Sequence, residues 1–331
     1  MKFDLQRFDE GFLKDELKGF VPVELASDII GDVTRGSTVL RLSKVEPMTS
    51  DTKRFNVFAG GVGAYWVGEG ERIKTSKAKW IFPEVTAKKI AVIVPVTREK
   101  LNDATIDVFA SIRPYIAEAF HKAIDAACLF GTGSPFAKNI YDVALNGGRT
   151  IADGTNARMD LDVSDVMALV EDKGFDVNGF VADISLKNRL RKLRDTNGNT
   201  LYVQGVTDTN GNRYDTLYSM PVEFSRNGAW DKTKALLIAG NWQYSVVGIR
   251  EEIAYEVLRE ATLQTVTLDD EKPLSLAEND MIALKVTMRL GFLPVKEDAF
   301  ALLVPKNAVI PDGDEPDGDE PDGDEPDGDE P

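Results

Sequence analysis

Apolar positions recur at three- and four-residue spacing within Thr97–Gly133, and the members are Val108, Ile112, Ile116, Ala119, Ala123, Ala127 and Phe130. This spacing gathers side chains on one face of a helix. Charged residues fall on the opposite side, namely Asp107, Glu118, Lys122 and Asp125. The pattern therefore predicts one long helix from Asp107 to Leu129, about 34 Å long at the usual rise per residue.

Both ends of this helix carry residues that suit helix ends. Thr105 or Asp107 can cap the start, and Gly131 and Gly133 can adopt the left-handed conformation that ends a helix. Pro114 lies inside the pattern and removes a helical hydrogen bond. We therefore expect a bend, or the true start of the helix, at residues 111–114.

Before the helix, the pattern predicts a short helix over residues 22–34 and a strand over Val39–Val45. Two extended arms, Lys53–Ala59 and Lys79–Val96, then flank a tract that contains Gly60, Gly61, Gly63, Gly68 and Gly70. Alternating segments around glycines predict a long hairpin. Such a hairpin has little core of its own, so it either packs on another surface or forms a solvated flap.

Short helices and strands are expected after the long helix. Ser134–Arg158 is rich in Gly, Asn and Ala and predicts a loop or short hairpin, whereas Leu161–Lys173 predicts a helix. A strand at Gly179–Ala182 precedes a basic helix that Asp183 or Ser185 can cap and that runs to Arg194. Further strands are expected at Met220–Ser225, Ala235–Ala239, Tyr244–Arg250 and Ile253–Arg259.

Strict alternation appears near the end of the chain. The apolar set is Ile282, Leu284, Val286, Met288 and Leu290, and the residues between are Ala283, Lys285, Thr287 and Arg289. This alternation predicts a strand with one buried face. We expect Phe300–Val304 to be its partner strand.

The five-residue segment Asp-Thr-Asn-Gly-Asn occurs twice, at residues 195–199 and 208–212, and we call the two copies the first and the second echo. Its glycine stands at the fourth position, whereas an EF-hand calcium loop needs glycine at the sixth. Asn-Gly is the preferred pair of a tight hairpin turn. We therefore interpret both copies as turns and not as calcium sites.

The net charge of -16 is concentrated at the C-terminus. Residues 311–331 are four copies of Pro-Asp-Gly-Asp-Glu and a final Pro, and they carry twelve of the carboxylates. The remaining body, with 43 acidic and 39 basic residues, is nearly neutral. The tail has no apolar residue to offset the entropy of ordering, so we expect a disordered solubilising segment, with weak calcium binding or partner docking as the alternatives.

Composition excludes several classes of protein. The 331 residues, 43% of them hydrophobic, suffice for one large or two modest cores. No apolar run approaches the roughly 18 residues that cross a bilayer, and residues 1–20 do not resemble a secretory signal. We therefore expect a soluble intracellular chain with no membrane partner. Near neutrality of the body also argues against sequence-independent binding of nucleic acid, which needs a basic surface.

Candidate chemistry is sparse. One cysteine, Cys128, excludes an internal disulfide, and we expect a buried structural thiol. One histidine, His121, excludes zinc sites built from several His or Cys ligands and disfavours a histidine triad. The sequence contains no phosphate loop, dinucleotide fingerprint or nucleophile elbow. We predict no catalytic residue, no cofactor and no metal.

Five segments in order resemble a known family. They are Ala64-Tyr-Trp-Val-Gly-Glu-Gly70, Val94-Pro-Val-Thr-Arg-Glu-Lys-Leu101, Asp125-Ala-Ala-Cys-Leu-Phe-Gly-Thr-Gly133, Leu190-Arg-Lys-Leu-Arg-Asp195 and the closing strands through Ala299-Phe300. Together they resemble the major capsid proteins of tailed bacteriophages, over about residues 20–306. The acidic tail lies outside the resemblance.

The resemblance implies the α+β Hong Kong 97-type capsid fold. Its parts would be an N-terminal arm (1–45), an extended hairpin called the E-loop (46–90), a P-domain with the spine helix (91–136), an A-domain (137–280), closing P-domain strands (281–310) and the tail (311–331). In that family the E-loop lies over a neighbouring subunit and the A-domains meet at fivefold and sixfold axes. The chain would then be a shell protein, a component of the virion assembled in the host cytoplasm, which encloses double-stranded DNA.

Inter-subunit contacts follow from the same comparison. On the E-loop the candidates are Trp66, Glu69, Arg72, Lys74, Lys77 and Lys79, and their acidic partners are Glu251, Glu252, Glu256, Asp269, Asp270 and Glu271. Some family members join an E-loop lysine to an asparagine with a glutamate's help. Lys74, Lys77 or Lys79 and Asn279 could imitate that pair, but Val286 stands where the glutamate is expected, so we predict no covalent crosslink.

The resemblance also implies partners. We expect homo-oligomers, pentamers and hexamers in a shell, together with a portal protein, a separate scaffolding protein and decoration proteins. Two alternatives stay open at this point. An encapsulin-type nanocompartment shares the fold but encloses an enzyme, and a carboxylate-based enzyme would need two carboxylates converging in a deep pocket.

Overall fold

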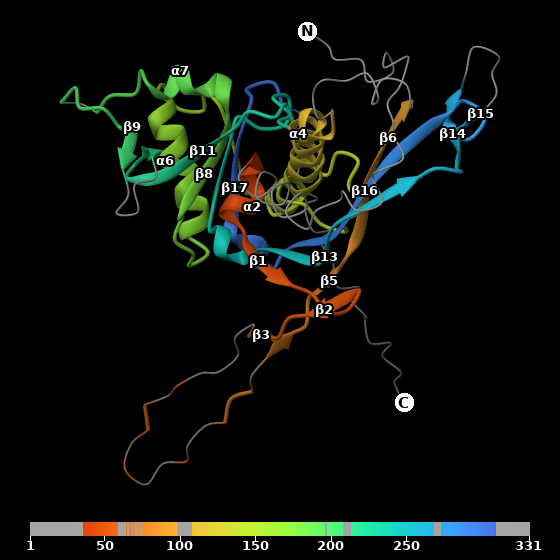
Figure 1. The fold of residues 1–331 in the computed structure, drawn as a ribbon. Helices are drawn as coiled ribbons and strands as arrows, with labels where there is room; N and C mark the ends of the chain where they lie inside the picture. Colours follow the sequence, from red (N-terminus) through yellow and green to blue (C-terminus); the bar gives the residue numbers. More distant parts are fainter. Residues whose placement is uncertain are drawn as a thin grey trace, which may run out of the picture.

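The computed structural model describes residues 36–58, 64, 66–67, 69, 72, 75–77, 79–97, 108–195, 197–207, 213–267 and 273–308. The expected helix at 22–34, the second echo at 208–212 and the tail lie outside the described residues. In the described part, a long helix stands between two sheets, and a narrow hairpin projects from the body (Figure 1).

The spine helix α4 spans Val108–Phe130 and ends as predicted, with Gly131 and Gly133 at φ of 67° and 63°. The helix begins before Pro114 and continues through it, so of the two expectations a start at residues 111–114 was wrong, and a bend there stays a prediction. The predicted face was also wrong in part. Ala119 and Ala123 are exposed, whereas Asp125 is completely buried. The buried face of the helix contains the larger side chains of Phe120 and Ile124 instead.

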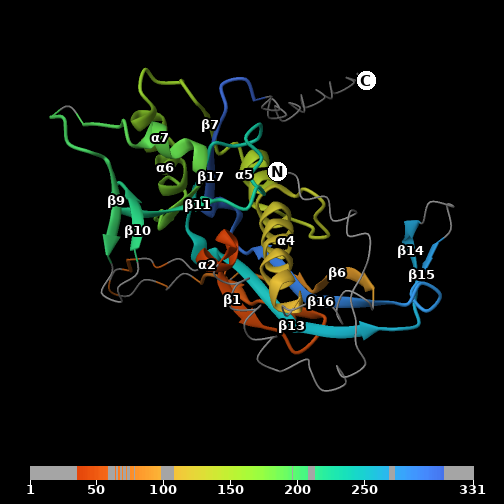
Figure 2. The same cartoon turned by 45° about the horizontal axis from the view of Figure 1, so that its top comes forward.

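A four-stranded sheet lies beside α4 (Figure 2). Its order is β1 (Lys44–Pro47), β13 (Ser245–Leu258), β16 (Met281–Pro294) and β6 (Lys88–Thr97). The predicted alternation in β16 is confirmed, because all five apolar members of the set from Ile282 to Leu290 are buried. Val286 and Met288 share one apolar core with Phe120 and Ile124 of α4.

A seven-stranded sheet forms the second layer. Its order is β7 (Thr150–Ala152), β17 (Phe300–Val304), β12 (Leu237–Gly240), β8 (Gly179–Asp183), β11 (Met220–Ser225), β10 (Arg213–Leu217) and β9 (Tyr202–Thr207). Helix α6 (Met159–Glu171) buries Val163, Val166 and Val170 against it. The expected pairing of Phe300–Val304 with the long closing strand was wrong, since β17 pairs with β12 and β7 while β16 pairs with β13 and β6.

Two further expectations need correction. A strand was expected from Val39, but helix α2 (Thr38–Leu42) forms there. The Ser37 side chain accepts a hydrogen bond from the Leu40 amide and so caps a helical turn. The segment after α4 contains helix α5 (Ile140–Asn146), capped by Asn139, in addition to the short strand β7. Both caps supply an oxygen to an otherwise unpaired amide.

The basic segment after β8 is shorter in helix than predicted. The Asp183 carboxylate accepts a hydrogen bond from the Ser185 amide, as expected of a cap, but only η3 (Ile184–Leu186) and α7 (Lys187–Leu190) follow. The first echo is confirmed as a turn. The Asp195 carboxylate accepts from the amides of Asn197 and Asn199 at 2.8 and 2.7 Å, with Gly198 at a φ of 86°.

The predicted long hairpin is confirmed. Strand β2 (Thr52–Arg54) pairs antiparallel with β5 (Glu84–Thr86), and β3 (Val57–Phe58) pairs antiparallel with β4 (Trp80–Ile81). A second hairpin, β14 (Thr262–Thr267) with β15 (Pro273–Ser275), lies at the opposite end of the four-stranded sheet (Figure 1). Short turns η4 (Trp242–Tyr244) and η5 (Glu297–Ala299) complete the described elements.

Candidate inter-subunit surface

The hairpin β2–β5 and β3–β4 exposes large apolar side chains along its length. Phe58 and Trp80 face one another with ring centroids 5.4 Å apart, and both are about half exposed, at 45% and 52%. Phe82 is exposed at 60%. A two-stranded ribbon is only marginally stable by itself, and this one leaves three large aromatic side chains exposed.

The base of the hairpin rests on two glycines. Gly248 of β13 and Gly291 of β16 are paired directly across the sheet. A Cβ atom at Gly291 would lie 2.4 Å from Val85 Cγ1 and 2.8 Å from the Thr86 carbonyl oxygen. A Cβ atom at Gly248 would lie 2.3 Å from the Met48 sulfur. The absence of side chains at these two positions therefore lets β5 lie directly on the four-stranded sheet.

Ion pairs hold the same base. Asp51, just before β2, pairs with Arg250 and, at 2.6 Å, with Arg289. On the other edge, Glu46 accepts hydrogen bonds from Lys44 and Lys53, and these two ammonium groups lower the pKa of the Glu46 carboxyl. Ion pairs thus hold the base of the hairpin, which we call its root, whereas the outer strands β3 and β4 carry exposed side chains.

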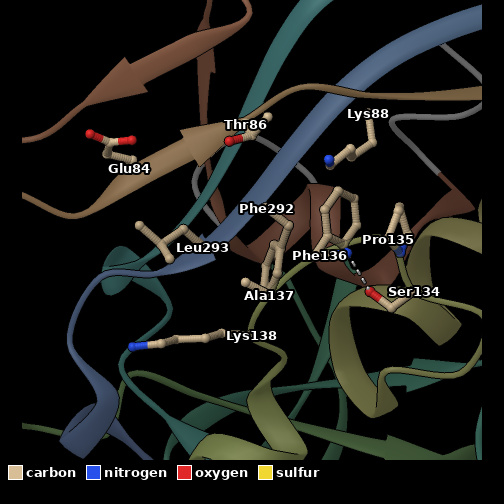
Figure 3. Close-up of a pocket in the computed structure, with 10 residues that line it drawn as sticks. All are labelled: Glu84, Thr86, Lys88, Ser134, Pro135, Phe136, Ala137, Lys138, Phe292 and Leu293. Atoms are coloured by element: carbon tan, nitrogen blue, oxygen red, sulfur yellow. Dashed lines mark hydrogen bonds between the residues drawn. The ribbon is translucent and has the colours of Figure 1, made fainter.

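A pocket lies where the hairpin root meets the segment after α4 (Figure 3). Its volume is about 260 Å³, and its lining residues are Glu84, Thr86, Lys88, Ser134, Pro135, Phe136, Ala137, Lys138, Phe292 and Leu293. The only carboxylate of this lining, Glu84, pairs with Arg54. The pocket therefore lacks the two converging carboxylates that the enzyme alternative would need.

The N-terminal segment is tied to the spine helix by a buried carboxylate. Asp125 of α4 accepts hydrogen bonds from the Ser37 hydroxyl at 2.5 Å, the amides of Thr38 and Val39 at 3.1 and 3.2 Å, and the Asn227 side chain at 2.8 Å. Burial raises the pKa of Asp125, while these hydrogen bonds lower it. One side chain thereby joins three segments distant in sequence.

The two residues singled out for chemistry are both buried. Burial raises the pKa of the Cys128 thiol well above its ordinary value, which disfavours the reactive thiolate. His121 is buried on α4, where a Cβ atom at Gly36 would lie 2.0 Å from its ring. Among the described residues, no cluster of three His, Cys, Asp or Glu could hold a metal ion, and no helix is long and apolar enough to span a membrane.

Of the sequence-predicted E-loop contact residues, Trp66, Glu69, Arg72, Lys77 and Lys79 are exposed in the structure, and Lys74 lies outside the described residues. None of these five lies in the pocket lining.

The acidic candidates are separated. Glu251 is exposed on β13, beside Arg289 in the register, and Glu252 lies in the same strand. Glu256 pairs with Lys285 of its own chain. Asp269, Asp270 and Glu271 fall between β14 and β15, outside the described residues.

Sequence reasoning missed the aromatic pair Phe58 and Trp80 and the root contacts of Asp51. One signal was present for the root: a glycine inside a strand indicates close approach of another backbone, and Gly248 and Gly291 both stand inside strands. The pairing of Asp51 with Arg289 spans 238 positions and carries no local signal.

Comparisons with known proteins agree with this architecture. The model of the phage capsid family matches residues 18–304. The chain is 33% identical over 299 residues to the major capsid protein of Staphylococcus phage 80alpha, covering 90% of this chain and 88% of that protein.

Solved structures are similar over the same region. A chain from Microbacterium phage Oxtober96 has a TM-score of 0.67 and 30% identity, covering 82% of this chain and 91% of that chain. A chain from Mycobacterium phage Adephagia has a TM-score of 0.69 and 25% identity, covering 82% and 90% respectively. Fold and sequence together define a viral shell protein of the Hong Kong 97 type. The chain belongs to the phage capsid family.

Proposed function

We propose that this chain is the repeating shell subunit of a tailed bacteriophage head, whose copies form pentamers and hexamers around double-stranded DNA. The observation that carries this proposal is the family match over residues 18–304, together with 33% identity to a major capsid protein. The exposed aromatic hairpin supports it, because a shell subunit repeats its contacts and can cover such a surface with a neighbouring copy.

The proposed division of the chain follows the expected parts, with residues 46–90 as the E-loop and about 137–280 as the A-domain. Each of the two large sheets contains strands from both sides of the boundary at residue 280, because β13 pairs with β16 and β12 pairs with β17. The chain therefore passes between the two layers more than once, so the proposed parts do not each coincide with one sheet.

The E-loop cations are proposed to contact acidic surface of a neighbouring copy. The cations are Arg72, Lys74, Lys77 and Lys79, and the acidic residues are Glu251, Glu252, Asp269, Asp270 and Glu271. Glu256 would have to break its ion pair with Lys285 of the same chain before it could contact a cation of a neighbouring copy. Exposed pairs stabilise by about 0–1 kcal/mol each, so most of the contact energy must come from apolar burial by Trp66 and the aromatic residues behind it.

We expect no isopeptide bond. Val286 is completely buried in the middle of β16 and is apolar, so it cannot assist proton transfer as a glutamate would. Asn279 is exposed and its side chain donates a hydrogen bond to the Ser275 carbonyl oxygen at 2.8 Å. The shell would be held by non-covalent contacts alone.

Other partners are a portal protein, a separate scaffolding protein and decoration proteins. The nearly neutral body supports enclosure of DNA without sequence-specific binding, because the surface does not attract phosphate strongly. Assembly would take place in the host cytoplasm. No observation favours the nanocompartment, since the curated relatives that match include the major capsid protein of a phage.

The test is negative-stain electron microscopy with light scattering on the purified chain, expressed alone and with its neighbouring genes. Closed shells, or rings of five and six copies, are the expected result. A 36.4 kDa monomer under every condition, including expression with portal and scaffolding genes, would overturn the proposal.

A further inference from the structure

The pocket at the hairpin root has the features of a socket for one aromatic side chain. Phe136 and Phe292 form one wall, with ring centroids 6.1 Å apart. Lys88 and Lys138 lie on either side of these rings (Figure 3). At about 260 Å³, the pocket is smaller than the roughly 300–1,000 Å³ typical of small-molecule sites. Its size suits a single large side chain.

The same chain exposes a large aromatic side chain, Trp66, which we call the knob. Trp66 has its side chain fully exposed, at 104% of the reference area, and the adjacent Val67 is 37% exposed. Trp66 follows the last paired position, Phe58, by eight positions, and a chain of that length spans at most about 29 Å when fully extended. Trp66 is absent from the lining of the chain's own pocket, so a different molecule must bury this indole if it is buried at all.

Charges at the two places are complementary. Glu69 follows Trp66 by three positions and is exposed. At the pocket, Lys138 already pairs with Glu297, whereas Lys88 has no carboxylate partner in the part of the chain that the structure describes. A Lys ammonium beside an aromatic ring also attracts an indole face. An entering Trp66 would therefore bring Glu69 to the unpaired cation.

We propose that Trp66 of one copy inserts between Phe136, Pro135 and Leu293 of a second copy, with Glu69 approaching Lys88 there. This inference rests on the proposed shell function and names the contact that joins neighbouring subunits. The knob and the socket are different surfaces of one chain, so the contact is head-to-tail. Head-to-tail contacts generate closed rings when the rotation between copies closes, as pentamers and hexamers require.

Cysteine crosslinking tests the contact directly. The variant carries Val67→Cys and Ala137→Cys, because Val67 is exposed next to Trp66 and Ala137 is exposed at the pocket, so the Trp66 indole stays in place. The native Cys128 is completely buried and does not compete. After mild oxidation of assembled particles, a non-reducing gel should show a ladder of linked subunits that ends at five and six copies. Each single variant, and the control pair Val67→Cys with Lys173→Cys, should give no ladder.

Two outcomes separate this contact from the shell function. Particles that assemble from the double variant but migrate as 36.4 kDa chains on the non-reducing gel would overturn the contact and leave the shell function standing. If the unsubstituted chain forms no rings or shells, the shell function itself fails.

A second measurement covers the case in which the double variant does not assemble. Chains with only Val67→Cys and chains with only Ala137→Cys are mixed and co-assembled with an excess of native chain. Linked dimers are expected from this mixture and not from either variant alone. Their absence from assembled particles would overturn the contact.

Discussion

Replacing Asp125 by alanine should detach the N-terminal segment from the spine helix. The carboxylate accepts four hydrogen bonds and is completely buried. Alanine would leave the amides of Thr38 and Val39 and the Asn227 side chain without their acceptor. Each buried unpaired donor costs about 1–3 kcal/mol, and water entering beside the short helix α2 recovers part of this. Three unpaired donors at this cost, partly offset by water, give an expected loss of about 3–5 kcal/mol.

The assay is thermal unfolding of the purified chain, followed by circular dichroism. At roughly 2 °C per kcal/mol for a chain of this size, Asp125→Ala should lower the melting temperature by about 6–10 °C. Asp125→Asn keeps one acceptor oxygen and should lose less. The matched control is Glu118→Ala, an exposed residue of the same helix, which should change stability by less than about 0.5 kcal/mol. Equal melting temperatures for Asp125→Ala and the control would refute this reasoning.

The same residue predicts a pH dependence. The pKa of Asp125 is raised by burial above the ordinary value of 3.8. A carboxyl with a raised folded pKa binds its proton more tightly in the folded chain, so its favourable contribution is complete below pH 3.8 and is lost as pH rises through the raised value. The stability of the native chain relative to Asp125→Asn should therefore fall as pH rises through that interval. A difference that grows with pH would show that the four hydrogen bonds outweigh burial.

Three further predictions concern the hairpin, the shell and the tail. Gly291→Ala should destabilise the chain by about 1–3 kcal/mol in thermal unfolding, because the new Cβ meets the Thr86 carbonyl oxygen at 2.8 Å; unchanged stability would mean that β5 does not lie on β16. Boiling mature particles in SDS should release single 36.4 kDa chains, and a covalent ladder would contradict the absence of a crosslink. Deleting residues 311–331 should leave assembly intact by electron microscopy, and failure of the truncated chain to form particles would show that the acidic tail has a structural role.

Local patterns predicted the elements well where the cause is local. The alternation from Ile282 to Leu290 and the turn at Asp195 depend on neighbouring residues, and the structure has both. Helix α5 was predictable but missed, since Asn139 three residues before Asp142 is a start signal and its side chain accepts from the Asp142 amide at 2.8 Å. The glycine-rich composition of the surrounding segment obscured this signal.

Contacts between distant parts of the chain determine the strand pairing, the burial and the pocket that the sequence pattern could not predict. The partner of Phe300–Val304 is set by β12, more than sixty positions earlier, and not by the adjacent strand. Asp125 looks like a solvent residue by its helical position, yet it is buried because the distant Ser37 and Asn227 bring donors to it. For the candidate surface, sequence predicted the hairpin and its cations, while the pocket required Phe136 and Phe292 to meet across 156 positions.

Cryo-electron microscopy of assembled particles tests the central claim most directly. We expect closed icosahedral shells in which the hairpin of each copy lies over the next copy and Trp66 enters the pocket beside Phe136 and Phe292. Particles whose subunits leave this hairpin in solvent, or a chain that stays monomeric beside portal and scaffolding proteins, would contradict the account.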